Sequence, residues 1–165
     1  MTSAADAAAR LDGILASAER LVASVPAPYV AHRAAGSGLD VRDLAHRVFG
    51  VALAYVDGMD MGRLPADWLE RPAPDDLHDG AAVARYGALV RGRVGGWFEG
   101  AGASEFARVI DTPEGPLSGD ALLARMTATA DASLTALRAA VDELGITPPE
   151  PRPAHARGRA PGTAP

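Results

Sequence analysis

The stretch that decides the fold is LLARMTATADASL, residues 122–134. Its apolar positions continue in phase to Leu144, with the spacing of one face of an α-helix. Ser118 is a candidate N-cap before the stretch, and Gly145 is a candidate C′ residue after it. The sequence therefore predicts a helix from about 119 to 144 that packs one face against a core.

Three earlier segments also carry apolar residues at helical spacing. The first covers 11–25 and stops at Pro26, and the second begins after the candidate N-cap Asp40 and ends before Gly58. The third runs over 79–98, although each of its glycines weakens a helix by about 1 kcal/mol relative to alanine. Four such helices predict an all-α four-helix bundle.

Three further segments depart from this pattern. Met59 to His78 is rich in Pro and Asp, and it exceeds the usual helix-to-helix loop, so we expect a crossover or a lid. Residues 109–117 indicate an extended piece and a tight turn. Six prolines among residues 147–165 predict a disordered tail. The chain is thus expected to form one domain over 1–146, followed by that tail.

Composition limits the compartment and the partners. The chain has no cysteine, which excludes disulfides and a thiol nucleophile and fits a reducing compartment. Charged residues interrupt the first 25 positions, and no run approaches the roughly 20 apolar residues of a membrane span. We therefore expect a soluble, cytoplasmic protein with no membrane partner. The net charge of −5 also disfavours nucleic-acid binding.

Three pieces of the sequence together resemble the DinB/YfiT-like superfamily, which includes mycothiol-dependent maleylpyruvate isomerases and related thiol S-transferases. They are DVRDLAH at 40–46, DTPEGPLS at 111–118 and the Leu144-Gly145 pair, and the resemblance covers about residues 8–146. It implies a DinB-like bundle with a long connection between helices two and three. It also implies a divalent metal held by one His of the second helix and two ligands, four apart, on the fourth.

The sequence departs from that ligand pattern. Counting back from Leu144-Gly145 places Thr129 and Ser133 at the fourth-helix positions. Strict counting on the second helix reaches Arg47 rather than His46, and one residue rotates a side chain by about 100°. Neutral hydroxyls are poor ligands beside imidazole or carboxylate. We therefore expect no metal at this site.

A polar stripe on the last helix has two open interpretations. Arg125, Thr129 and Ser133 recur every four residues beside the apolar face. They form either a solvated edge whose hydroxyls bond back to the helix, or a small-molecule pocket. In the pocket, Arg125 would hold a carboxylate or phosphate and the hydroxyls would bond the ligand. Arg47 and Trp68 complete the candidate substrate-binding set.

His46 is the candidate catalytic residue. Asp43 lies three positions before it, so the carboxylate can favour the imidazolium and fix the tautomer. The pair is either a general-base dyad or a partly exposed histidine with a local partner. His32, His78 and His155 fall in predicted loops or the tail, without ligand-like spacing. No phosphate-binding loop and no Gly-x-Ser-x-Gly elbow occurs.

Three hypotheses of function follow. The first is a metal-free, DinB-like protein that binds a small polar metabolite and catalyses isomerisation, elimination, cyclisation or group transfer in biosynthesis or detoxification. The second is a Zn- or Ni-dependent mycothiol S-transferase or maleylpyruvate isomerase that uses His46 with Asp131 or His78 as unconventional ligands. The third is a non-catalytic binding protein, in which one helical face serves a homodimer.

Overall fold

The computed structural model describes residues 4–147 of the chain, and these are mostly helical. A short antiparallel pair, β1 with β2, precedes the last helix and joins Val109 to Ser118 and Ile110 to Leu117. The elements in chain order are α1 (Ala4–Ala23), η1 (Ala27–Tyr29), α2 (Val41–Met61), α3 (Gly80–Gly100), α4 (Ala103–Ala107), β1 (Val109–Ile110), β2 (Leu117–Ser118) and α5 (Gly119–Glu143).

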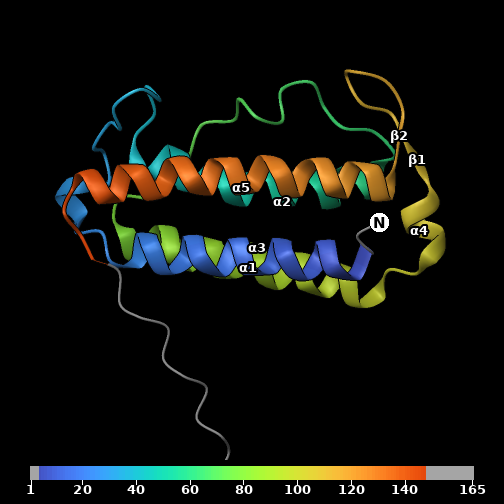
Figure 1. Cartoon of the computed structure of the whole chain (residues 1–165), viewed down its shortest axis with the longest axis horizontal. Coiled ribbons are helices and arrows are strands. Elements are labelled where there is room, and N and C mark those ends of the chain that lie inside the picture. The colour runs from blue at the N-terminus through green and yellow to red at the C-terminus, as the bar shows by residue number, and fades with distance from the viewer. Residues whose placement is uncertain (1–3, 148–165) are drawn as a thin grey trace, which may run out of the picture.

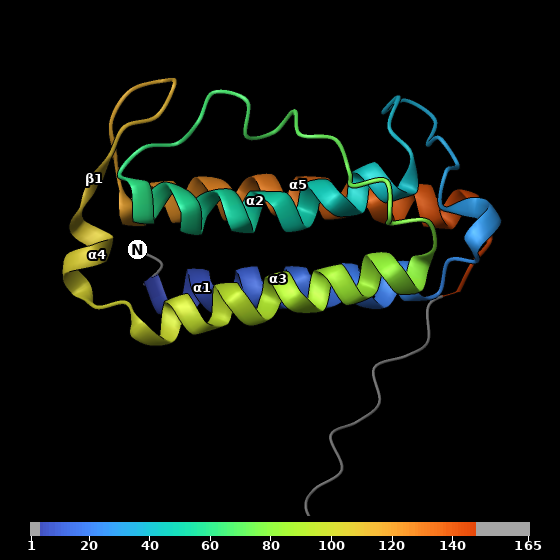
Figure 2. The ribbon, with the colours of Figure 1, turned by 180° about the vertical axis from the view of Figure 1, so that it is seen from behind.

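The four long helices form two layers, with α2 beside α5 in one and α1 beside α3 in the other (Figure 1). Helices α2 and α3 run in the same direction, so the chain must return along the bundle between them. Figure 2 shows that residues 62–79 make this crossover along the outside of α2. Leu64, Trp68 and Leu77 of this connection are buried. The predicted all-α bundle with a long second connection is confirmed.

Capping explains where the helices begin and end. The Asp40 side chain accepts a hydrogen bond from the backbone N–H of Asp43 at 2.8 Å, and Ser118 accepts one from the N–H of Ala121 at 3.3 Å. Gly145 adopts φ 68° just after α5, as predicted. The expected end of α2 before Gly58 is wrong. The helix continues to Met61, because Gly58 packs against the start of the connection rather than breaking the helix.

The core places α2 very close to α3. Phe49 on α2 is fully buried, and its ring lies against Gly87 on α3. A Cβ atom at position 87 would lie 2.7 and 2.9 Å from the Cε1 and Cε2 atoms of that ring. The absence of a side chain at Gly87 therefore sets the separation of the two helices, one turn beyond the candidate catalytic residue His46.

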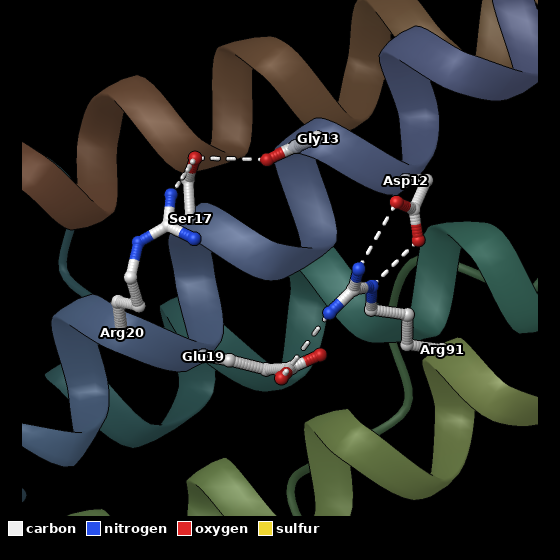
Figure 3. A network of polar contacts seen from close by, with 6 residues as sticks. All are labelled: Asp12, Gly13, Ser17, Glu19, Arg20 and Arg91. Carbon is white, nitrogen blue, oxygen red and sulfur yellow. Dashed lines mark hydrogen bonds and ion pairs between the residues drawn. The ribbon is translucent and has the colours of Figure 1, made fainter. Parts of the chain in front are cut away.

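On the opposite layer, a polar network ties α1 to α3 (Figure 3). The Arg91 guanidinium donates to both carboxylate oxygens of Asp12, at 2.5 and 3.1 Å, and its Nη1 lies 3.9 Å from Glu19. Burial raises the pKa of Glu19 more than Arg91 lowers it. This bidentate pair fixes the register of α1 on α3.

Of the predicted disordered tail, 147–165, only Thr147 lies within the described residues. The division into one domain and a tail stays a prediction. Within residues 4–147, none of the helices combines the length and the apolar character needed to cross a bilayer.

Candidate functional site

A partly open hollow of about 100 Å³ lies between α2, the connection and α3. We call it the His46 pocket. It brings together three of the residues singled out from the sequence, His46, Arg47 and Trp68. The polar and aromatic side chains that line it are His46, Arg47, Asp57, Trp68, Arg71 and Tyr86.

His46 lies half-buried in this pocket. Its ring stacks on Tyr86 of α3, with centroids 5.4 Å apart and planes inclined by 26°. Burial lowers the pKa of His46, and the negative charge of Asp43 raises it by less. Asp43 favours the imidazolium, as expected, but burial has the larger effect on the pKa of His46 and favours the neutral ring. No hydrogen bond joins the two side chains in the described part of the chain. The imidazole is held neutral at neutral pH, the form that accepts a proton.

Two unpaired guanidinium groups flank the same pocket. Arg47 of α2 and Arg71 of the connection both line it, and neither makes an ion pair with any residue of 4–147. The carboxylate of Asp57 is already taken, because Arg93 donates to it at 2.5 Å. The free charge at the pocket is therefore positive, and planar guanidinium donors match a carboxylate.

A second, shallower hollow of about 340 Å³ lies between α2 and α5. We call it the α2–α5 groove. Thr129 and Ser133 lie on its α5 wall, and Arg47 and Leu69 separate it from the His46 pocket. The Thr129 hydroxyl donates to the carbonyl of Arg125 at 3.0 Å, and the Ser133 hydroxyl donates to the carbonyl of Thr129 at 2.9 Å. The two hydroxyl protons are therefore used within the helix.

Arg125 and Asp43 lie apart from the His46 pocket. The Arg125 guanidinium lies 2.8 Å from a carboxylate oxygen of Glu114, in the turn between β1 and β2, and Arg125 lines neither hollow. Asp43 faces a neighbouring hollow that it shares with Arg47, Leu69 and Arg71. The structure thus gathers Arg47 with Thr129 and Ser133 on one side, and with His46 and Trp68 on the other.

Comparison with known proteins identifies the class of fold. No protein-family profile matches the sequence, and no curated protein matches it. The structure is similar to the crystal structure of a DinB-like protein, YjoA, from Bacillus subtilis, with a TM-score of 0.66. The likeness covers 86% of this chain and 92% of that one, at 15% sequence identity.

The chain therefore has a DinB-like fold, an all-α bundle with a long crossover between α2 and α3. This confirms the fold that the sequence resemblance implied. At this level of identity the comparison bears on the fold alone, so the chemistry must come from the side chains.

The residues at the ligand positions that the sequence resemblance implied do not fit a divalent metal. Thr129 and Ser133 offer hydroxyls that are hydrogen-bonded to their own helix. Arg47 of α2 lines the same groove, and this permanent cation would repel the metal ion. The groove therefore presents neither the imidazole nor the carboxylate donors that such a metal prefers.

The alternative ligands of the second hypothesis also lie apart. Asp131 is on the surface and accepts from Arg10 at 2.8 Å. His78 is at the end of the connection, where its Nδ1 lies 2.7 Å from the carbonyl oxygen of Asp76. Among residues 4–147, no group of three or more His, Cys, Asp or Glu side chains is placed to hold a metal ion.

Sequence reasoning missed Tyr86 and Arg71 among the residues of the pocket. Tyr86 lies on α3 at helical spacing with its apolar residues, but it is only partly buried and stacks on His46. Arg71 lies in the irregular connection, where helical periodicity gives no information about direction. Its position three residues after the buried Trp68 was the one signal in the sequence that it returns to the bundle.

Proposed function

We propose that this DinB-like protein binds a small carboxylate in the His46 pocket and acts on it by acid–base catalysis, without a metal. The observation that carries the proposal is that His46 lines one pocket with two guanidinium groups, of Arg47 and Arg71, that have no ion-pair partner in the described chain. Burial also lowers the pKa of His46. The arginines hold the anion, and His46 accepts a proton from it.

The geometry supports a role for His46 in proton transfer. The Tyr86 ring packs on one face of the His46 imidazole, and both rings line the pocket. Trp68 is buried and forms one wall of the pocket, and Arg47 and Arg71 lie on its rim, with Arg47 half-buried and Arg71 exposed. When the carboxylate held by these arginines is attached to a ketone, as in a 2-oxo acid, the C–H on the other side of the ketone is acidic, because the ketone oxygen takes up the negative charge as the proton leaves. Isomerisation, elimination and cyclisation all begin with such a proton transfer.

The test is proton exchange. EDTA-treated protein is incubated in D2O with a panel of short 2-oxo acids, and loss of the proton on the carbon next to the carbonyl is followed by NMR. We expect exchange that His46→Gln lowers by about 10²–10⁴-fold, the usual contribution of a placed general base. Arg71→Ala raises the concentration needed for half-maximal exchange.

Two results would contradict the proposal. Exchange that appears only when Zn²⁺ or Ni²⁺ is added would restore the metal-dependent hypothesis. Saturable binding of the acids with no exchange of any panel member would favour a non-catalytic binding protein.

A further inference from the structure

The hollows around α2 adjoin one another. The His46 pocket, the hollow at Asp43 and the α2–α5 groove all have Arg47 and Leu69 in their walls. A ligand that enters the His46 pocket can therefore extend past Leu69 into the groove without leaving the protein surface.

The sizes of the two ends differ. The His46 pocket has about 100 Å³ and is the more enclosed of the two. It suits the compact anionic end of a ligand. The α2–α5 groove has about 340 Å³ and is more open. Any ligand larger than a short acid must place its remaining atoms outside the pocket, and the groove is the adjoining space.

The walls of the groove are mainly apolar and favour a hydrocarbon ligand. Leu39, Leu44 and Leu69 line it together with alanines of α5. Its three hydroxyl groups already donate within the chain, Thr129 and Ser133 to their own helix and Ser37 to the carbonyl of Leu39 at 3.3 Å. Among the side chains of the groove, Arg47 is thus the one whose N–H donors have no hydrogen-bond partner within residues 4–147. It lies at the junction with the His46 pocket.

Taken together, these features lead us to propose that the substrate is an amphiphilic carboxylate, with its anionic end in the His46 pocket and an apolar tail over Leu69 in the α2–α5 groove. The inference rests on the proposed function for the anionic end. The pocket sets the reacting group, and the groove sets the length and polarity of the tail.

The experiment measures affinity against chain length. EDTA-treated full-length protein is titrated calorimetrically with straight-chain carboxylates from propionate to decanoate, below their micellar concentrations. Affinity is expected to rise by up to about fourfold for each methylene that enters the groove. His46→Gln should leave this dependence on length unchanged, because His46 does not line the groove.

Two matched variants locate the tail. Ala132 lines the groove and is exposed, so Ala132→Trp fills the space without disturbing the core. Ala121 is an equally exposed alanine of α5 outside both hollows, and Ala121→Trp is its control. We expect Ala132→Trp to flatten the dependence on chain length while propionate binds as in the wild type. Ala121→Trp should retain the full dependence.

Each other outcome decides a different point. Short acids that bind with affinity independent of length overturn the inference and leave the proposed function intact. If long acids gain as much affinity with each methylene on Ala132→Trp as on the wild type, the tail lies outside the groove, and the inference is overturned. Failure of every carboxylate to bind removes the proposed function itself.

Discussion

Substitution of Gly87 by alanine tests the close packing that positions α2 against α3. In an exposed helix this change stabilises by about 1 kcal/mol, because glycine is the poorer helix former. Here the new Cβ atom would lie 2.7 and 2.9 Å from two carbons of the Phe49 ring, and closer still to Cζ. Phe49 is fully buried and touches Tyr86 edge-on, so the ring has little room to move.

Forcing such a contact in a packed core costs roughly 1–3 kcal/mol. After the gain in helix propensity, we expect Gly87→Ala to lower the free energy of unfolding by about 1 kcal/mol, with a range of about 0–2. Gly92 and Gly96 of the same helix have no atom within 4 Å of an added Cβ. Their alanine variants should each gain up to about 1 kcal/mol. Urea unfolding followed by circular dichroism measures all three, and each 1 kcal/mol corresponds to about 2–4 °C in Tm.

A double-mutant cycle gives the control. In a Phe49→Leu background the ring is absent, so Gly87→Ala should become neutral or stabilising. The reasoning is refuted if Gly87→Ala is as stable as Gly92→Ala. It is also refuted if the penalty at position 87 is unchanged when the Phe49 ring is removed.

Three further predictions concern charge. Because burial lowers the pKa of His46 below its ordinary 6.5, the unfolded chain binds more protons just below that pH, so stability should fall there as the solution is acidified. Urea melts from pH 5 to 7 should show this slope, and His46→Gln should reduce it. Glu19 has the opposite sign, since its pKa is raised above 4.5 by burial. Relative to the wild type, Glu19→Gln should therefore have a more favourable free energy of unfolding at pH 7 than at pH 4. An equal difference at the two pH values would contradict this. For carboxylate binding measured by calorimetry, Arg71→Ala should cost roughly tenfold or more in affinity, whereas Arg125→Ala should cost nothing.

The fold could be predicted from local signals because its helix ends carry explicit caps. Asp40, Ser118 and Gly145 marked boundaries that the structure reproduces. The end of α2 could not be read the same way, since Gly58 lies inside the helix, where it packs near Leu64 of the connection. The short α4 gave no periodic signal, because five residues are too few for one.

The candidate site was predictable only in part. Residue spacing could not show whether His46 or Arg47 faces the interior of the bundle, but the structure does. The residues are about 100° apart, and both are half-exposed, with His46 against α3 and Arg47 at the junction of the two hollows. Arg125 was expected at the site from its place in a four-residue repeat. Its partner Glu114 lies in a hairpin turn whose position depends on tertiary structure.

The most direct measurement is the titration of the His46 ring by NMR in EDTA-treated protein, with and without a short carboxylate such as propionate. A carboxylate held beside the ring favours the imidazolium, so the account predicts that the acid shifts the His46 ring signals and raises the pKa of His46. Arg71→Ala should weaken both effects. Unchanged His46 signals at saturating propionate, or a response that requires an added divalent metal, would contradict it.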